Sequence, residues 1–398
     1  MTVKVSEAHR RARLISRHRL RDPAATVAAA ADAMVALHAT DPVTVYLSAR
    51  ARVPSATAES VDDALYAERG VVRMLGMRRT VFVVPAGLLP VVQRACTDDV
   101  ARRLRRQLER DLANGGVGDG DAAAWLRHLG ESALRALAAR GSATGAQLSA
   151  DEPLLRTQLI YTPDKSYGGA VNITSRVLGL LAAEGHMIRG HRRGGWSSGQ
   201  FEWSLPAVWL AGSGAARTAD AAGVDAAAAR AELARRWLWT FGPAPVADLQ
   251  WWAGWTGAQT KAALAALPVS EADLGGQPGV LLARDEEFDA EPAPVAALLP
   301  ALDPTPMGWQ ARDWFLGVHA TALFDRTGNI GPTVWWEGRI VGGWAQRASG
   351  EVVYRLLEDI GADGGAAVAA EAAALEAWLD VWRVTPRFRT PLERELST

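Results

Sequence analysis

Repeated helix and hairpin signals constrain the fold of this 398-residue chain more than any other feature. Three successive stretches each contain apolar runs at helical spacing, a turn of small residues, and then two short β-runs around a tight turn. Residue identity between the stretches is low, but the order of helix, helix and hairpin is the same. A chain of this length also exceeds one ordinary core. We therefore expect several units of related architecture.

The first unit contains clear start and stop signals. Asp22-Pro23 opens an alanine-rich run to Leu37, Asp41-Pro42 starts a second run, and residues 60–69 have a serine cap and a terminal glycine. Two β-runs then flank residues 76–78. These signals predict three helices followed by a hairpin.

The next two units repeat this order. Helices are expected at residues 121–140, 142–150 and 172–185, a loop at 151–169, and a long polar hairpin at 187–203. In the third unit, residues 226–241 and two runs within 242–267 predict helices, and residues 280–283 belong to a hairpin.

The pattern changes in the last quarter of the chain. From Met307 onward, apolar and polar residues alternate around turns at 337–338 and 349–350, and residues 366–380 predict one long helix. Helix, helix and hairpin is the order of a winged helix. The prediction is an α+β fold with three tandem winged helices and a C-terminal domain that is an α+β unit or a small β-barrel. The expected domains are 1–115, 116–215, 216–295 and 296–398.

Composition and charge narrow the classes of partner. Residues 1–110 hold 19 basic and 11 acidic residues, whereas the rest holds 24 basic and 33 acidic, which is the asymmetry of a one-sided DNA contact. Chance clustering of arginines is the alternative. Cys96 is the single cysteine and no zinc spacing occurs, so we expect a reducing compartment, no metal and no cofactor. No signal peptide or membrane-spanning run is found, and nothing indicates an obligate partner. A cytoplasmic monomer is expected.

Several phrases of the chain resemble the winged-helix superfamily of bacterial DNA glycosylases that act on bulky alkyl adducts and crosslinks. The resemblance is carried by ALHATDPVTVYLSARAR (36–52), MRRTVFVVP (77–85), MIRGHRRGGWSSGQFEW (187–203), TFGPAPVADLQWWAGW (240–255), ALLPALDPTPMGWQARDWFLG (297–317) and GNIGPTVWWEGRIVGGWAQR (328–347). It implies three tandem winged helices arranged in a C shape and completed by a C-terminal β-barrel-like domain. Double-stranded DNA carrying alkyl adducts would lie in the concave face of the C, where a β-hairpin probes the groove.

The family's catalytic signature is a Gln–aliphatic–Gln or Gln–aliphatic–Asp triplet, and the matching positions here are His38, Ala39 and Thr40, followed by Asp41. A cationic N7-alkylpurine leaves without an acid, so the site must place a water and stabilise an oxocarbenium-like sugar. A neutral His38 could accept the water's proton, Thr40 could bond that water, and Asp41 could face the developing cation. A structural interpretation is also open: Asp41 before Pro42 fits an N-cap, and His38 a half-buried side chain.

Arginines mark the expected DNA contacts. The hairpin at 187–203 offers Arg189, His191, Arg192, Arg193 and Trp196, the first hairpin offers Arg78 and Arg79, and Arg50 and Arg52 follow the triplet. A solvated charged wing is the alternative for each. The tryptophans at 251, 252, 255, 335, 336 and 344 are expected in the core.

Three functions remain from these observations. The first is a monofunctional glycosylase for bulky N7-alkylpurines, with self-resistance to a genotoxin as its expected role. The second is a non-catalytic DNA-binding regulator, and the third is a protein that sequesters adducts or drugs. A bulky adduct does not enter a snug pocket, so base flipping is not expected.

Overall fold

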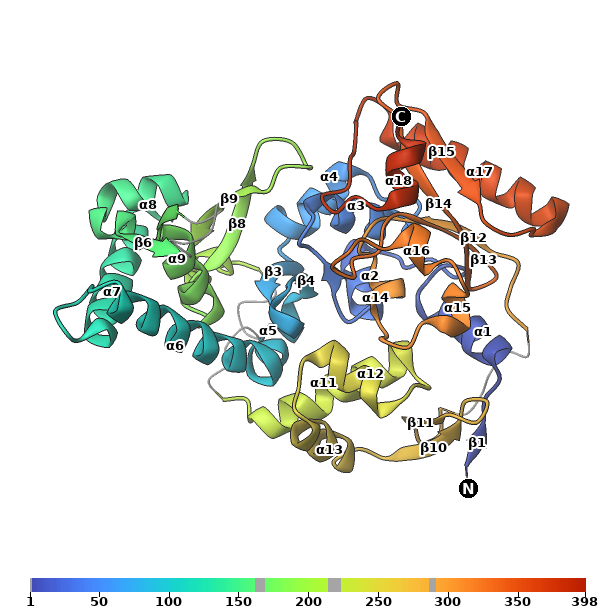
Figure 1. Cartoon of the computed structure of the whole chain (residues 1–398), viewed down its shortest axis with the longest axis horizontal. Coiled ribbons are helices and arrows are strands. Elements are labelled where there is room, and N and C mark those ends of the chain that lie inside the picture. Colours follow the sequence, from blue (N-terminus) through green and yellow to red (C-terminus); the bar gives the residue numbers. More distant parts are fainter. Residues whose placement is uncertain (1, 162–168, 214–222, 286–290) are drawn as a thin grey trace.

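A computed structural model describes residues 2–161, 169–213, 223–285 and 291–398 of the chain. Its fold is mixed α+β, with many helices and several small sheets (Figure 1). Four successive segments of the chain are distinguished by their elements, and we describe them in order.

The first segment holds four helices and a hairpin before a long helical stretch, one helix more than the sequence predicts. Its elements are β1 (Val3–Lys4), α1 (Glu7–Arg17), α2 (Val27–Ala33), β2 (Leu37–His38), α3 (Pro42–Arg50), α4 (Ala58–Asp62), β3 (Val71–Leu75), β4 (Val81–Pro85), α5 (Leu89–Val92) and α6 (Asp98–Asn114). The predicted helix from Asp22 to Leu37 is wrong at both ends: Thr26 caps α2, and Leu37 pairs in a sheet.

The second segment repeats the helices and adds a small extra hairpin. It comprises α7 (Ala122–Arg140), β5 (Ser142–Ala143), α8 (Gly145–Asp151), β6 (Gln158–Tyr161), β7 (Gly169–Asn172), α9 (Thr174–Ala183), β8 (Ile188–Arg193), β9 (Gln200–Ser204) and α10 (Pro206–Trp209). The predicted loop at 151–169 is therefore only partly right, because β6 and β7 pair with each other. Part of that stretch, 162–168, lies outside the described residues.

The third segment holds α11 (Ala226–Phe241), α12 (Val246–Ala253), α13 (Gly257–Ala265), β10 (Val269–Asp273) and β11 (Pro278–Leu282). The three segments share a pairing as well as an order. In each, residues shortly after one helix (α2, α7 or α11) pair with the last hairpin strand: β2 with β4, β5 with β9, and Ala244 with Val280 in β11.

The fourth segment is an open sheet with helices. It contains β12 (Ala296–Leu299), α14 (Pro304–Met307), α15 (Asp313–Leu316), α16 (Ala320–Leu323), β13 (Thr333–Trp336), β14 (Arg339–Gln346), β15 (Val352–Leu356), α17 (Gly361–Leu379) and α18 (Pro391–Leu396). The strands form one antiparallel sheet in the order β12-β13-β14-β15. Among the described residues this sheet does not close, so the predicted barrel is wrong.

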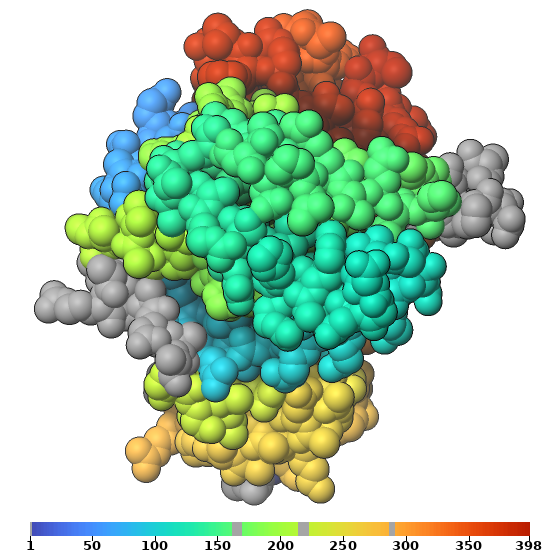
Figure 2. Space-filling view, turned by 90° about the vertical axis from the view of Figure 1, so that its left-hand side faces the viewer, coloured from blue at the N-terminus to red at the C-terminus, as the bar shows by residue number. Residues whose placement is uncertain are grey.

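Two hydrophobic cores hold these segments together. In one, the buried residues all lie between Leu108 and Trp203, and the other joins the first, third and fourth segments with Ile188, Trp196 and Trp209 of the second. The second segment projects from the rest, with the C-terminal segment above it and the third below it in Figure 2. Predicted core tryptophans such as Trp335 and Trp344 are buried, whereas Trp251 is partly exposed.

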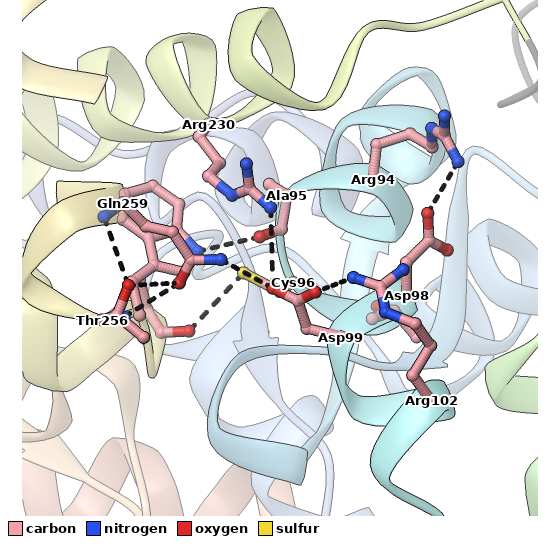
Figure 3. Close-up of polar contacts among 12 residues, drawn as sticks. Arg94, Ala95, Cys96, Asp98, Asp99, Arg102, Arg230, Thr256 and Gln259 are labelled. Atoms are coloured by element: carbon pink, nitrogen blue, oxygen red, sulfur yellow. Dashed lines mark hydrogen bonds and ion pairs between the residues drawn. The ribbon is translucent and has the colours of Figure 1, made fainter. Parts of the chain in front are cut away.

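The start of α6 is fixed where the first and third segments meet (Figure 3). Asp99 accepts a hydrogen bond from Gln259 at 2.8 Å, lies 3.5 Å from Arg230 of α11, and pairs with Arg102. One turn earlier, Trp255 Nε1 donates to the Ala95 carbonyl at 2.8 Å. This anchoring sets the direction in which α6 leaves for the second segment.

A buried ion pair joins the first and fourth segments. Arg52, just after α3, donates to both carboxylate oxygens of Asp303 at 2.9 and 2.7 Å, and both side chains have 0% exposure. Asp303 also accepts from the Ser48 hydroxyl at 2.6 Å and from the Thr305 backbone N–H at 2.9 Å. Hydrogen bonds thus surround both charges, which is the condition under which buried ions are tolerated.

Replacing Asp303 by Asn should lower the free energy of unfolding by about 3–5 kcal/mol, because Arg52 would keep its buried charge without a counter-ion. Denaturant unfolding at pH 7 measures this. The control is Arg347→Ala, which removes an exposed pair with Glu351 and should change stability by less than about 0.5 kcal/mol. Equal midpoints for D303N and wild type would contradict the role assigned to the pair.

The same pair should make stability depend on pH. Burial alone would raise the pKa of Asp303, but the charge and hydrogen bonds of Arg52 outweigh it and hold that pKa below its ordinary value. A carboxylate of this kind adds stability above its unfolded pKa of about 3.9 and loses it as pH falls through the lowered folded pKa. The difference between wild type and D303N should therefore be full at neutral pH and shrink in strong acid.

Candidate functional site

His38 occupies a buried strand position at the start of the predicted site. It lies in β2 opposite Phe82 of β4, and its ring meets the Phe82 ring edge-on at 5.3 Å. The residue is 5% exposed, and Nδ1 is buried without a hydrogen-bond partner among the described residues. Burial, reinforced by the charge of Arg78, lowers the pKa of His38 to about 3. The imidazole is therefore neutral at physiological pH, and the neutral ring can accept a proton.

Asp41 and Thr40 lie at the junction with the C-terminal tail. Asp41 caps α3 by accepting from Val43 N–H at 3.2 Å, which confirms the structural interpretation of this residue. Its other carboxylate oxygen accepts from the Arg387 backbone N–H at 2.8 Å, and Thr40 offers its carbonyl to the Arg387 side chain at 3.3 Å. Burial raises the pKa of Asp41 against these hydrogen bonds. In the described part of the chain, no hydrogen bond joins His38 to Thr40 or Asp41.

Arg78 connects the His38 region to the third segment. It sits in the turn between β3 and β4 with a left-handed φ of 52°, and its guanidinium lies 3.8 Å from the centre of the Trp251 ring. Gly254 permits this approach, because a Cβ there would lie 3.2 Å from the Arg78 backbone nitrogen. Burial, with Arg312 nearby, lowers the pKa of Arg78 to about 10, so it remains a cation at pH 7.

Two predicted DNA contacts lie in the interior instead. Arg52 is fully enclosed by its pair with Asp303, and Arg50 pairs with Glu371 of α17 with only 8% of its side chain exposed. Both arginines lie at the end of α3 or just after it. The residues that pair with them, Glu371 and Asp303, come from the fourth segment, far along the chain. In this structure neither reaches a surface that DNA could contact.

The hairpin β8–β9 is present where the sequence predicts it, but its tip is docked against the first and fourth segments. Trp196 is 2% exposed and lies among aromatic rings at 5.0 Å (Tyr46), 5.9 Å (Trp378) and 5.6 Å (Trp382). Arg192 pairs with Asp62 of α4 at 2.6 Å. Trp196 is thus a packing residue in this conformation, and the tip bridges the units.

The remaining hairpin residues are more open. Arg193 is half exposed and pairs with Glu202 at 3.1 Å, and His191 is exposed beside Trp209 and Tyr66. Arg189 lies over the Phe201 and Trp203 rings at 5.3 and 5.1 Å, and burial lowers its pKa to about 10. His191 and Arg193 are exposed and Arg189 is partly exposed, so DNA can contact part of each side chain.

A basic cleft of about 560 Å³ contains functional residues that the sequence analysis did not single out. Six arginines line it and no acidic residue does: Arg79, Arg103, Arg106, Arg110, Arg176 and Arg189. Arg103, Arg106 and Arg110 recur at the i, i+3, i+7 spacing of one helix face, so the signal was present in the sequence. Arg79, Arg103 and Arg106 are exposed.

No group of three metal-binding side chains occurs among the described residues. In the same residues, no helix has the length and apolar character needed to span a membrane.

The comparisons with known proteins agree with this architecture. A family model described as DNA glycosylase AlkZ-like matches residues 31–378. The solved structure of the DNA glycosylase AlkZ of Streptomyces sahachiroi superposes on this chain with a TM-score of 0.72 at 19% sequence identity. The match covers 96% of this chain and 99% of that one, and it supports the fold. No curated protein matches the chain in sequence. Because the family model spans most of the chain, including His38 and Arg312, this protein belongs to the AlkZ-like DNA glycosylase family.

Proposed function

We propose that this protein hydrolyses the N-glycosidic bond of bulky N7-alkylated purines in duplex DNA, with His38 as the base that activates water. The observation that carries the proposal is a neutral, buried imidazole at the position of the family's amide triplet. Monofunctional action on adducts, as in self-resistance to a genotoxin, is part of the same proposal.

The reaction requires little of the protein, because an alkylated purine already carries a positive charge. The C1′–N9 bond breaks and its electron pair goes to the base, which leaves neutral. The water oxygen bonds to C1′, and the water's proton passes to His38. The products are the free base and an abasic sugar. Thr40 would hold the water, and the Asp41 carboxylate would stabilise the positive charge that develops on the sugar.

The helix and hairpin units supply the DNA-binding architecture in this proposal. Their shared order and pairing support three winged helices within 1–115, 116–215 and 216–295, with 296–398 as a separate C-terminal unit. The duplex would lie along the basic cleft, where Arg79, Arg103 and Arg106 meet phosphates. Arg78 and Arg79 are adjacent in one turn, so the turn connects the cleft with the surroundings of His38. The hairpin residues Arg189, His191 and Arg193 would contact the groove.

Substituting His38→Ala should lower the rate of base release from an N7-alkylguanine duplex about 100-fold or more, the usual range for a lost general base. Asp41→Asn should also slow release, since it removes the charge facing the sugar. Binding of an uncleavable duplex should stay near wild type. His128→Ala is the matched control, because His128 is exposed on α7. Unchanged turnover in both H38A and D41N would refute the site.

The pH profile provides a separate test of His38. Because burial lowers its pKa to about 3, the residue stays an unprotonated base throughout the neutral range. Base release by D41N, in which position 41 no longer titrates, should therefore be nearly constant from about pH 5 to 8. A base with an ordinary histidine pKa of about 6.5 would instead lose activity below that value. A fall in rate with a midpoint near 6.5 would count against the assignment.

The cleft arginines can be tested through the salt dependence of binding. Each lost phosphate contact should reduce the slope of log K against log salt by about 0.9, so Arg103→Ala with Arg106→Ala should reduce it by roughly 2. The matched control is Arg127→Ala with Arg135→Ala, two exposed arginines on α7 outside the cleft. Equal slopes for the two double variants would place the duplex elsewhere.

A further inference from the structure

We propose that Arg10, Arg78 and Arg312 form a clamp for one backbone phosphate of the DNA, adjacent to His38. The inference rests on the proposed function for its choice of DNA as the source of the phosphate. The three arginines come from α1, from the β3–β4 turn and from the stretch before α15, so the clamp exists only where the first and fourth segments meet.

Arg10 carries donors that the protein leaves unused. The residue is 6% exposed, and its guanidinium lies 4.0 Å from the centre of the Trp314 ring. Nε and Nη2 are both buried, and neither makes a hydrogen bond with any described residue. Buried guanidinium donors normally find an acceptor, because an unpaired buried donor is costly.

Arg312 and Arg78 show the same feature, and both guanidinium groups lie near the ring of Trp251. Trp251 has the Arg78 guanidinium at 3.8 Å and that of Arg312 at 5.2 Å from its ring centre. Arg312 Nε donates to the Pro306 carbonyl at 3.0 Å, but its Nη2 is buried and unbonded, as is Arg78 Nε. Shared stacking keeps these two cations close together.

The local charge is not balanced. Asp248 attracts both Arg10 and Arg312, but its Oδ1 is taken by the Gln310 and Ala311 N–H groups at 2.9 Å each. Its Oδ2 is buried and forms no hydrogen bond to the described residues. Glu7 also attracts Arg10, but Glu7 is exposed and pairs with Arg11. Burial lowers the pKa of Arg10, Arg78 and Arg312 to about 10, so all three are cations at pH 7, and the buried carboxylate of Asp248 attracts two of them, Arg10 and Arg312.

A phosphodiester fits this arrangement better than another ligand class. Planar guanidinium groups match phosphate oxygens with parallel donors, and a monoanion reduces the excess charge without reversing it. Arg78 acts electrostatically on His38, so a phosphate held here lies beside the candidate base. The clamp would then position the sugar attached to that phosphate for attack at C1′.

The test uses uncleavable duplexes in which single phosphates around the lesion are replaced, one at a time, by uncharged methylphosphonates. Wild-type binding should weaken roughly tenfold or more at one position next to the lesion, since one charged contact is lost. Arg312→Gln and Arg10→Gln should weaken binding of the unmodified duplex, yet show no further loss at that position. Arg326→Gln, an exposed arginine outside the cluster, should keep the wild-type pattern.

The remaining outcomes of this experiment either refute the clamp or separate it from the catalytic proposal. Variants that keep the wild-type methylphosphonate pattern refute the clamp, as does wild-type sensitivity spread evenly over all positions. If Arg10→Gln fails to fold, the half-buried Arg312 still carries the test. Inorganic phosphate that raises the Tm of wild type but not of R312Q, without any position-specific loss on DNA, would indicate a free-anion site and overturn the proposal. A wild-type protein with the expected binding pattern but no base release would refute the catalytic proposal and leave the clamp standing.

Discussion

The buried ion pair between Arg52 and Asp303 fixes the geometry on which the site depends. Two fully enclosed charges are tolerated because the contact is bidentate and Ser48 and Thr305 add hydrogen bonds to Asp303 and Arg52. His18 extends the network from Thr305 at 2.9 Å to the Thr240 carbonyl at 3.2 Å, which brings α1 and α11 to the same point. The helix that Asp41 caps is therefore held against three other elements, and the strand that carries His38 leads directly into it.

This interaction also explains which features the sequence could predict. Helix order, the Asp41 cap and both polar hairpins depend on neighbouring residues, so local signals were sufficient to predict them. The burial of Arg52 and Trp196 depends on partners far along the chain: Asp303 for Arg52, and Trp378 of α17 for Trp196. The residues around Arg52 in the sequence do not show that its partner lies 251 residues later. For this reason the sequence alone predicts a surface position for Arg52.

Other differences have equally specific causes. The C-terminal strands have the alternation of a sheet, but alternation does not determine whether a sheet closes, and β12 and β15 remain its edges among the described residues. The pairing of β6 with β7 joins residues on either side of proline and glycine signals that favour a loop. By contrast, the basic face of α6 was readable from the spacing of Arg103, Arg106 and Arg110, and only the cleft that they line required the structure.

The replacement of an amide by histidine is physically consistent with a cationic substrate. A protonated imidazole would repel an N7-alkylpurine and could not accept a proton from water. Burial between the β2–β4 sheet and its neighbours, with Arg78 nearby, keeps the His38 ring neutral, so it presents a polar, uncharged group as an amide does. It differs from an amide in having a ring nitrogen that can take up the water's proton, although its lowered pKa makes it a weak base. On this view the cation beside His38 has two effects: it holds the base neutral before the reaction, and it offers charge to the DNA backbone that must bring the sugar to it.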